Sequence, residues 1–345
     1  MEKWIDLRSD TVTKPTPAMW EAMAQAELGD DVYGEDPTVN RLEFMAAERL
    51  GAEAALFVTS GTQGNLVAVL THCGRGAEVI LGQRSHTFLY EQGGIAALGG
   101  ITPWPIPNQD DGTMLLDDIR SAIRGDNIHY PRTRAICLEN THNVCNGTPL
   151  TPEYTHAVAE IAREAGLKLH LDGARVFNAA AALAVDVKDL VCDVDSVQVC
   201  LSKGLCAPVG SLLCGSAGFI AEARRTRKML GGGMRQAGIL AAAGIVALDQ
   251  MADRVGEDHV RAQRLADGLA RIPGIVVSPP ASNILYFGLA EDAPLTPEEI
   301  VAGLEARGVR VLGRIGGRFR AITHYWINDE DIDHAVSAMT EVVVL

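Results

Sequence analysis

The sequence predicts an α/β domain with a mostly parallel mixed sheet flanked by helices, followed by a smaller α+β domain. Helical and strand patterns alternate from about residue 38 to residue 215, which is typical of parallel strands joined by helices. After an alanine-rich helix near 237–252, the pattern changes to short strands and two helices. The length of 345 residues also exceeds the size at which one hydrophobic core usually keeps growing. We therefore expect domains at residues 1–248 and 249–345.

Helix signals and apolar runs place the elements of the larger domain. Thr38 is expected to cap a helix that ends at Gly51. Thr151 and Pro152 begin another helix, with the proline in its first position, and Gly166 ends it. Buried strands are expected in the runs ALFV (55–58), AICLE (135–139), LKLHLD (167–172) and VQVCL (197–201).

The smaller domain is expected to be a compact unit. One helix begins at Thr296 and Pro297 and ends at Gly308, and a final helix begins at Asp331. Strands are expected in the runs GIVVS (274–278), NILYFGL (283–289), VRVL (309–312) and RAITHYW (320–326). The sequence has no internal repeat, low-complexity segment or Ser/Gly linker, so the two domains are expected to pack against each other.

Charge and composition exclude some partners. The sequence has 44 Asp and Glu residues and 30 Lys and Arg residues. The resulting net charge of −14 disfavours nucleic acid and anionic membranes as binding partners. The start, MEKWIDLRSD, has acids where a secretory signal has a basic and then an apolar segment, so we expect a cytoplasmic protein. The longest apolar run, Ile239–Leu248, is too short to span a bilayer.

The cysteines predict neither a disulfide framework nor a zinc site. There are seven, an odd number, and no two form a Cys-x-x-Cys pair. Most lie in apolar stretches, where a thiol is usually a small core residue. We therefore expect no catalytic cysteine and no metal site.

Four groups of polar residues are expected where strands end: residues 60–62 (Ser-Gly-Thr), His86, Asp172 with Arg175, and Lys203. Ligands of open α/β sheets collect at this edge. Each group also has a structural interpretation. The run TSGTQGN (59–65) could form an ordinary capped turn, and Asp172 could simply pair with Arg175. Lys203 could extend to water.

Together these groups match one cofactor. Pyridoxal phosphate needs a lysine for its Schiff base, a carboxylate at its pyridinium nitrogen and a helix N-terminus for its phosphate. Lys203 and Asp172 each end a strand, with enough chain between them for a helix and a return strand. The turn at 59–65 follows a strand and opens a helix. The conjunction predicts a pyridoxal phosphate site.

Eight motifs carry a family resemblance: DLRSDTVTKP (6–15), GDDVYGEDPTVN (29–40), SGTQGN (60–65), ENTHN (139–143), HLDGAR (170–175), LSKGLCAPVGSLL (201–213), GGGMRQAGILAAAG (231–244) and RAITH (320–324). In these motifs the chain resembles the low-specificity and L-allo-threonine aldolases, which depend on pyridoxal phosphate and have the aminotransferase-like fold type I. The resemblance implies reversible cleavage of L-threonine, L-allo-threonine and other β-hydroxy-α-amino acids to glycine and an aldehyde such as acetaldehyde.

The resemblance also implies how the cofactor is bound. Lys203 would carry pyridoxal phosphate as a Schiff base, and Asp172 would keep the pyridine nitrogen protonated. Arg175 would hydrogen-bond the ring hydroxyl. Gly61 and Thr62 would bind the phosphate.

The small-molecule amino-acid substrate would be bound by the same region. The resemblance implies that His86 stacks on the ring near the β-hydroxyl, and that Ser9 and Arg320 bind the substrate carboxylate, so the N-terminal segment contributes to the active site. The base is expected to be His86 or His142, although His142 has an equal interpretation as a structural hydrogen-bonding residue. The other expected substrate-binding residues are Tyr33 and Arg175.

The family's assembly implies that a neighbouring subunit completes the site. Arg235 and Lys228 would reach the phosphate from that subunit, and the family suggests a homotetramer built from two dimers. Two positions depart from the family's pattern. Cys206 stands where glycine is common, and a thiol there could form adducts with aldehydes. The loop VCNGTPL (144–150), beside His142, bears on substrate shape more than on reaction type.

Other functions stay open at this point. A β-eliminating lyase acting on tryptophan, tyrosine or cysteine derivatives, or an aminotransferase, would use the same scaffold and differ in its products. A non-enzymatic acidic scaffold would need no cofactor. A metal-dependent hydrolase is disfavoured because no two histidines have ligand spacing on one helix.

Overall fold

The computed structural model describes residues 4–291, 293, 295–315 and 317–344. Its strands are β1 Ile5–Asp6, β2 Ala54–Val58, β3 Glu78–Gly82, β4 Thr102–Ile106, β5 Thr133–Glu139, β6 Lys168–Asp172, β7 Ser196–Cys200, β8 Ser211–Gly215, β9 Ile275–Ser278, β10 Ile284–Leu289, β11 Val309–Arg310, β12 Leu312–Ile315 and β13 Arg318–Ile322. Its α-helices are α1 Pro17–Ala24, α2 Pro37–Leu50, α3 Gly61–His72, α4 His86–Leu89, α5 Gly94–Ala97, α6 Leu116–Ala122, α7 Pro152–Glu164, α8 Val176–Leu183, α9 Val187–Val191, α10 Ala217–Met229, α11 Gly238–Val246, α12 Gly256–Leu269, α13 Pro297–Glu305 and α14 Asp329–Val344. Within these ranges no helix has the length and apolar character needed to cross a membrane.

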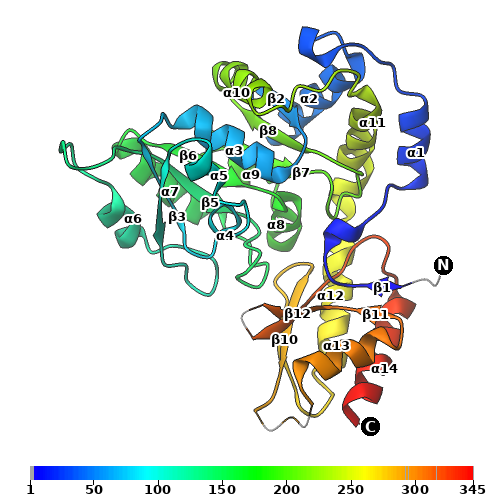
Figure 1. Ribbon diagram of the computed structural model, residues 1–345. Coiled ribbons are helices and arrows are strands. Elements are labelled where there is room, and N and C mark those ends of the chain that lie inside the picture. Colours follow the sequence, from blue (N-terminus) through cyan, green and yellow to red (C-terminus); the bar gives the residue numbers. More distant parts are fainter. Residues whose placement is uncertain (1–3, 292, 294, 316, 345) are drawn as a thin grey trace.

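A seven-stranded sheet forms the centre of the larger part of the molecule (Figure 1). Its strand order is β2-β8-β7-β6-β5-β3-β4, and every pair is parallel except the two that β8 makes. This confirms the expected mostly parallel mixed sheet. The predicted runs at 55–58, 135–139, 167–172 and 197–201 correspond to β2, β5, β6 and β7, although residues 167 and 201 lie just outside β6 and β7.

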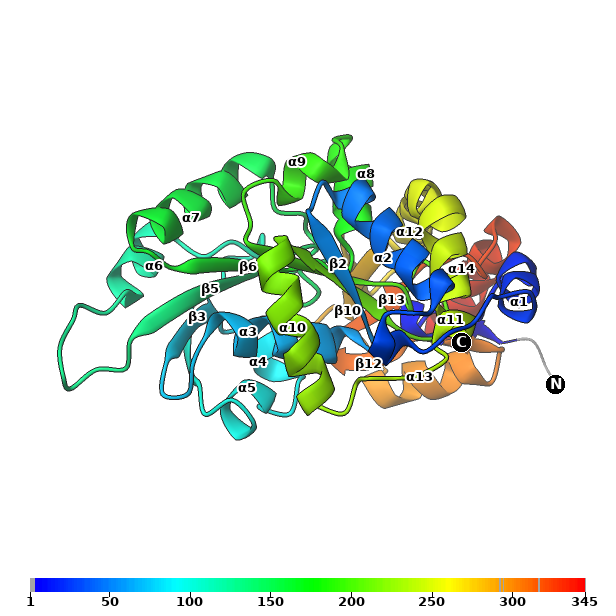
Figure 2. The same cartoon turned by 90° about the horizontal axis from the view of Figure 1, so that it is seen from above.

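Helices cover both faces of this sheet (Figure 2). Along β2 the side chains alternate between two cores. Ala55 and Phe57 belong to a core shared with α2, α7, α8, α9 and α11, whereas Leu56 and Val58 pack with α3 and α10. Both faces of the sheet are buried, which explains why the sequences of these strands are nearly continuous apolar runs.

The start of α2 differs from the sequence-based expectation. The capping residue is Asp36, whose Oδ1 accepts the backbone N–H groups of Thr38 and Val39 at 3.1 and 3.0 Å. Pro37 takes the first helical position, where its missing N–H costs nothing. The prediction of Thr38 as the cap was therefore wrong, because an aspartate one residue before the proline satisfies two N–H groups at once. Gly51 ends the helix as expected, at φ +68°.

Two other helix predictions are confirmed. Thr151 caps α7 by accepting the N–H of Tyr154, and Gly166 follows the helix at φ +66°. Thr296 caps α13 in a capping box, in which its hydroxyl accepts the N–H of Glu299 and the Glu299 carboxylate accepts the N–H of Thr296.

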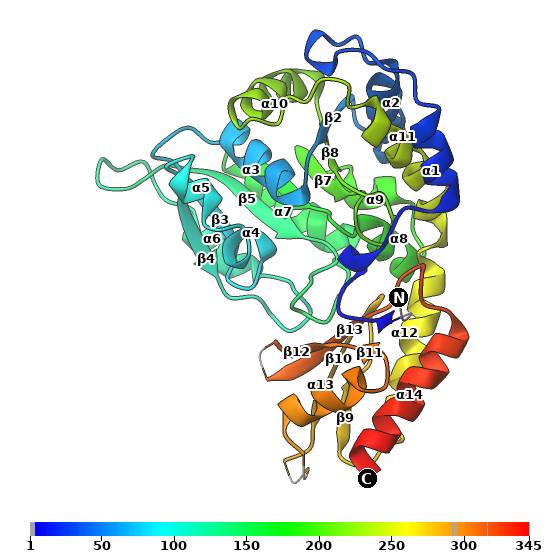
Figure 3. The same cartoon turned by 45° about the vertical axis from the view of Figure 1, so that its right-hand side comes forward.

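The C-terminal part forms a separate sheet with its own core (Figure 3). Its antiparallel order is β12-β13-β10-β9, and α12, α13 and α14 pack against it. β1 pairs in parallel with β11, and Ile5 and Leu7 belong to the same core. The N-terminal segment is thus held by the C-terminal unit before the chain enters the larger part.

The predicted boundary near residue 248 lies inside a nearly continuous helical stretch. α11 passes through a π-helical turn, Ala247–Met251, and a 3₁₀ turn, Ala252–Arg254, before α12 begins. We retain the division into residues 1–248 and 249–345 as a proposal. Limited proteolysis that cuts near this stretch and leaves two folded fragments would support it.

Candidate active site

The strand-end residues predicted from the sequence gather at one edge of the large sheet. β6 ends at Asp172, and β7 ends shortly before Lys203. These two strands are adjacent and parallel, as expected. α3 begins at Gly61 directly after β2, and α4 begins at His86 after β3. All four groups therefore follow the carboxyl ends of strands that run in the same direction, where α/β sheets bind ligands.

The loop after β7 fixes the backbone at Lys203. Its carbonyl oxygen accepts hydrogen bonds from Thr13 Oγ1 at 2.8 Å and from the N–H of Cys206 at 2.9 Å. The side chain is half-buried. Its positive charge is a minor influence on the pKa values of Asp10 and His86 and acts to lower each, although other groups raise the pKa of His86 overall.

Asp172 is buried and held in a fixed orientation. Its Oδ2 accepts a hydrogen bond from Asn65 Nδ2 at 2.8 Å, and its Oδ1 accepts the backbone N–H of Ala174 at 3.1 Å. An ionised carboxylate offers about four lone-pair sites, so capacity remains for a further donor such as a ring N–H. The alternative in which Asp172 pairs with Arg175 is not what the structure shows, because Arg175 pairs with Asp10.

Arg175 and Asp10 form a buried ion pair with two hydrogen bonds. Arg175 Nε lies 2.8 Å from Asp10 Oδ2, and Nη2 lies 2.6 Å from Oδ1. Burial by itself raises the pKa of Asp10, but Arg175, with smaller effects from Lys203 and His324, lowers that pKa to about 2. Nη1 of Arg175 has no hydrogen bond among the described residues and stays available to a ligand.

His86 is oriented by two carboxylates. Its backbone N–H donates to Glu139 Oε2 at 2.6 Å, and its ring Nδ1 lies 2.9 Å from Glu91 Oε1. Burial lowers the pKa of His86, but Glu91 and Asp172 outweigh that effect and raise it above its ordinary value. Because a carboxylate oxygen accepts, Nδ1 donates, and the neutral ring carries its lone pair on Nε2.

Arg320 lies in β13, a strand of the small antiparallel sheet. Its Nη1 donates to Asn143 Oδ1 at 2.9 Å and its Nη2 to the carbonyl oxygen of Arg8 at 3.2 Å. Burial and the charge of Arg175 lower its pKa. Nε is buried and has no hydrogen-bond partner within the described ranges. Two neighbouring guanidinium groups favour a bound anion, because a carboxylate between them relieves their repulsion.

His142 is buried without hydrogen bonds to its ring. Both ring nitrogens lack a partner among the described residues. The ring packs against Gly112, where an added Cβ would come within 3.0 Å of the His142 Cγ. No protein group among the described residues hydrogen-bonds the imidazole of His142, so the structure offers no support for a structural hydrogen-bonding role.

The N-terminus of α3 offers free backbone donors. Ser60 Oγ accepts the N–H of Gln63 at 3.1 Å, so the N–H groups of Gly61 and Thr62 precede the capped position and have no intrahelical partner. An added Cβ at Gly61 would lie 2.8 Å from Cys200 Sγ, and only glycine fits there. Such a helix start suits a phosphate.

Three of the predicted residues take no part in the hydrogen bonds of this group within the described residues. Tyr33, Lys228 and Arg235 are all exposed. The Arg235 guanidinium pairs with Asp30 at 2.9 Å and lies 5.9 Å from the Tyr33 ring centroid. In the described part of the chain, none of the three hydrogen-bonds or forms an ion pair with Asp172 or Lys203.

Ser9 lies closer to the strand ends, on the segment that carries Asp10. It is half-buried, and its Oγ accepts hydrogen bonds from the backbone N–H of Thr11 at 3.2 Å and from Thr11 Oγ1 at 2.8 Å. Its own hydroxyl hydrogen is therefore free to donate to a ligand.

The residues at the strand ends fit pyridoxal phosphate. The amine of Lys203, the spare lone pairs of Asp172 and the start of α3 provide the three kinds of group that this cofactor needs. The unpaired buried nitrogens of His142 and Arg320 also indicate that a polar molecule completes the site.

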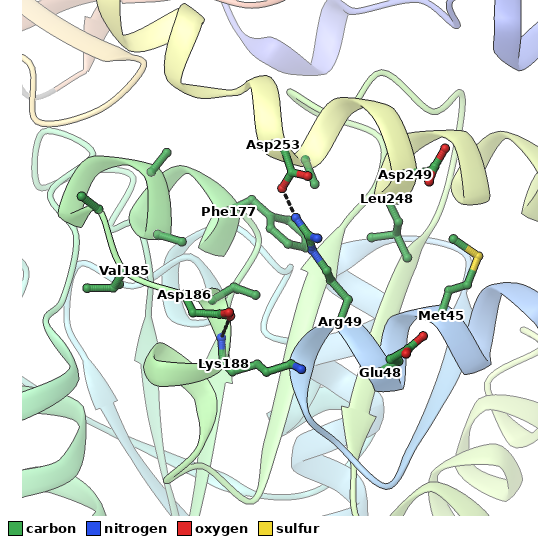
Figure 4. Close-up of a pocket in the computed structure, with 15 residues that line it drawn as sticks. Met45, Glu48, Arg49, Phe177, Val185, Asp186, Lys188, Leu248, Asp249 and Asp253 are labelled. Atoms are coloured by element: carbon green, nitrogen blue, oxygen red, sulfur yellow. Dashed lines mark hydrogen bonds and ion pairs between the residues drawn. The ribbon is translucent and has the colours of Figure 1, made fainter.

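A cleft of about 790 Å³ lies away from these residues (Figure 4). Its walls come from α2, α8, α9 and the helical turns between α11 and α12. Arg49 crosses it and pairs with Asp253. None of the predicted site residues lines this cleft.

Sequence reasoning missed four residues of the site: Asp10, Asn65, Glu91 and Asn143. Asp10, Asn65 and Asn143 lie inside motifs that were recognised, and each directly contacts a residue that was predicted, namely Arg175, Asp172 and Arg320. Glu91 lies just beyond the end of α4, which begins at His86, and no helical spacing in the sequence indicated their contact.

The comparisons with known proteins agree with this arrangement. The sequence model of the family described as beta-eliminating lyase matches residues 6–292. The low-specificity L-threonine aldolase 1 of Arabidopsis thaliana is 49% identical over 345 residues, covering 99% of this chain and 96% of that protein. The low specificity L-threonine aldolase of Escherichia coli (strain K12) is 48% identical over 328 residues, covering 95% of this chain and 96% of that protein.

The fold is also found in a solved structure. Leishmania major threonine aldolase shares it with a TM-score of 0.83 and 23% identity, covering 98% of this chain and 99% of that chain. The sheet, its helical layers and the small C-terminal sheet are those of fold type I, and the family match identifies a lyase. The chain belongs to the beta-eliminating lyase family, and within it to the low-specificity L-threonine aldolases. The expected family and fold class are confirmed.

Proposed function

We propose that the protein cleaves L-threonine, L-allo-threonine and other β-hydroxy-α-amino acids reversibly to glycine and an aldehyde such as acetaldehyde. The observation that carries this proposal is the placement of Lys203 and Asp172 at the ends of adjacent parallel strands, with Arg175 and Arg320 beside them. The high identity to proteins named low-specificity L-threonine aldolases supports the reaction.

The cofactor of this reaction is pyridoxal phosphate. Lys203 would hold it covalently through a Schiff base, Asp172 would accept the hydrogen bond of the ring N–H, and Arg175 would donate to the ring hydroxyl. Gly61 and Thr62 would donate to the phosphate. When bound, pyridoxal phosphate accepts the electron pair of the broken Cα–Cβ bond. A carboxylate at the ring nitrogen supports this role because it keeps a proton on that nitrogen.

The substrate carboxylate would bind to Arg320, with help from Ser9 and Arg175. Arg320 is buried and already held from two sides by Asn143 and by the backbone of Arg8, so its guanidinium is oriented before the substrate arrives. A carboxylate at that point would supply the acceptor that the Arg320 Nε lacks.

The proton of the β-hydroxyl would pass to a histidine. His86 presents a free lone pair on Nε2, because its Nδ1–H donates a hydrogen bond to Glu91. His142 has two unpaired ring nitrogens and can act directly or through water. We assign the removal of the proton to one of these two residues, with His86 also stacked on the cofactor ring.

The active site would be completed by a second subunit. Lys228 and Arg235 would reach the phosphate, and Tyr33 the substrate, from the neighbouring chain of a homotetramer built as two dimers. Their exposure supports this role, as does the exposure of the large apolar residues Trp20, Phe44, Met229 and Ile239 on α1, α2, α10 and α11. Sedimentation at micromolar concentration tests the assembly, and a monomer with full activity would contradict it.

We place the protein in the cytoplasm. All seven cysteines lie in the described part of the chain and are free, which suits a reducing compartment. Fractionation of cells producing the full chain tests this assignment.

The activity is tested by release of acetaldehyde from L-threonine and L-allo-threonine, measured side by side with pyridoxal phosphate present. Lys203→Ala is the blank. Acetaldehyde and glycine from the unaltered chain alone would support both the reaction and the lysine. A yellow protein that forms pyruvate and ammonia from cysteine or tyrosine, and no acetaldehyde from threonine, would instead favour a β-eliminating lyase.

A further inference from the structure

A chain of buried hydrogen bonds runs away from the strand ends, behind Asp172. Asn65 in α3 contacts both buried carboxylates of the site, with Nδ2 2.8 Å from Glu91 Oε1 and 2.8 Å from Asp172 Oδ2. On its other side, Asn65 Oδ1 lies 3.0 Å from His170 Nε2. The chain continues from His170 Nδ1 to Ser196 Oγ at 2.8 Å.

The last member of the chain is His72, whose Nε2 lies 2.7 Å from Ser196 Oγ. Its ring stacks on Phe219, with the centroids 4.4 Å apart. Asn65, His170 and Ser196 are each at most 1% exposed, so bulk water does not compete for these bonds.

When both carboxylates are ionised, the donors and acceptors give one direction along this chain. Burial raises the pKa of Glu91, but in the ionised state Glu91 and Asp172 only accept, so the NH₂ group of Asn65 faces them and its carbonyl oxygen faces His170. His170 must then donate from Nε2, which leaves Nδ1 as an acceptor for the Ser196 hydroxyl hydrogen. The Ser196 oxygen in turn accepts from His72 Nε2.

Both histidines are neutral, as this direction requires. Burial lowers the pKa of His170 to about 4 and the pKa of His72 to about 3. A neutral imidazole has one donor and one acceptor, and each imidazole nitrogen that takes part makes one hydrogen bond of the chain. The bonds therefore form one continuous series from His72 to the two carboxylates.

We propose that Asn65 is a positioning residue that ties Glu91 and Asp172 to a single amide, and that His170 and Ser196 fix which way this amide faces. Through Asp172 it holds the carboxylate toward the cofactor ring, and through Glu91 it keeps the proton of His86 on Nδ1. One side chain thus sets the orientation of the ring-nitrogen partner and the free nitrogen of His86 together. This inference rests on the proposed function for its catalytic consequence, but not for its hydrogen-bond geometry.

The geometry is tested first on cofactor-free protein labelled with ¹⁵N-histidine. NMR should find the proton of His170 on Nε2 and that of neutral His86 on Nδ1. A proton on His170 Nδ1 would overturn the direction of the chain, because Asn65 would then have to turn its oxygen toward the carboxylates. This measurement needs no activity, so its result is separate from success or failure of the proposed reaction.

The positioning role is tested with Asn65→Asp, which keeps the shape and removes both amide donors. The dissociation constant for pyridoxal phosphate should rise about tenfold or more, since two hydrogen bonds to charged groups are lost and a third carboxylate is added. The kcat for threonine should fall by more than KM rises. The matched control is Asn178→Asp, a buried asparagine that contacts the ring of His259 outside the chain described above. It should leave both quantities within about twofold.

A milder variant guards against a failure to fold. Ser196→Ala removes only the hydroxyl that holds His170 Nδ1, so the His170 spectrum should show both tautomers and the affinity for pyridoxal phosphate should fall by less than in Asn65→Asp. Unchanged tautomers and affinity in Ser196→Ala, or equal losses in the Asn65 and Asn178 variants, would overturn the proposal.

Discussion

Asp10 and Arg175 are 165 positions apart in the chain and form a buried ion pair with two hydrogen bonds. Asp10 lies on the segment that begins in β1 with the C-terminal unit, whereas Arg175 follows β6 in the large sheet. The pair therefore links the two parts of the molecule at the candidate site. Asp10 also supplies negative charge beside three neighbouring cations, which are Arg175, Lys203 and Arg320.

Asp10→Asn should destabilise the protein strongly. Removing one partner leaves Arg175 buried without its counter-charge, at a cost on the order of 3–5 kcal/mol. The folded pKa of Asp10, about 2, lies below its unfolded value of 3.8. The stabilisation is therefore present above about pH 4 and is lost as the pH falls toward 2. Urea unfolding of both proteins across this range measures it.

The control for this variant is Asp333→Asn, which breaks the exposed pair with Arg264. That change should cost less than about 1 kcal/mol at any pH. An Asp10 variant no less stable than the Asp333 variant at pH 7 would contradict the role given to the buried pair.

The effect of Asp258→Asn on the free energy of unfolding should depend on pH in the opposite sense to the effect of Asp10→Asn. The side chain of Asp258 is buried, and neither carboxylate oxygen has a hydrogen-bond partner in the described residues. Burial raises its pKa to about 7, although Arg254 and Arg261 lie 3.6 and 3.7 Å away. Its folded pKa is above the unfolded value, so the wild type binds an extra proton when folded and loses stability as the pH rises from about 4 to 7.

The asparagine variant cannot ionise, and its stability relative to the wild type should rise through the same pH range by roughly 2–4 kcal/mol. The measurement is the free energy of unfolding at pH 5 and pH 8. A difference between variant and wild type that is the same at both pH values would show that Asp258 titrates normally.

Arg320→Lys should raise the KM for threonine about tenfold or more. A lysine can reach one carboxylate oxygen, but it cannot make two parallel hydrogen bonds or keep the contacts with Asn143 and the Arg8 carbonyl. Steady-state kinetics measure the effect, and the absorbance of bound pyridoxal phosphate serves as the control for an intact cofactor site. An unchanged KM and kcat would remove Arg320 from the substrate site.

The elements of the site could be predicted from the sequence because each chemical residue directly follows an apolar run. Asp172 ends β6 and Lys203 follows β7, and local pattern alone places both at one edge of the sheet. The partners of these residues could not be predicted in the same way. Asp10, Asn65 and Asn143 make their contacts across more than a hundred positions, and those pairings depend on how the helices and the small sheet pack.

The cap of α2 shows the same limit on a local scale. Asp36 and Thr38 are both good capping residues, and the sequence alone did not choose between them. Asp36 also accepts the N–H of Gly238 at 2.9 Å, from the start of α11. A contact with a distant helix therefore adds to the preference for the aspartate.

The cysteines give a last prediction, which bears on the expected reactivity of Cys206 toward aldehydes. Cys206 has no exposed surface, and burial raises the pKa of its thiol to about 12, so almost no thiolate forms at neutral pH. It also adopts φ +65°, in the left-handed region where glycine is favoured. Cys192 is the one exposed thiol of the seven, all of which lie within the described residues.

Brief treatment of the native protein with iodoacetamide should therefore add one label per chain, at Cys192. Peptide mass spectrometry locates the label. Cys192→Ser should take up none and keep full activity, since this residue lies outside the candidate site. Two results would contradict this prediction: rapid labelling of Cys206, or inactivation of the Cys192→Ser variant by acetaldehyde through a thiol adduct. Either result would show that the loop after Lys203 opens far enough for the Cys206 thiol to ionise.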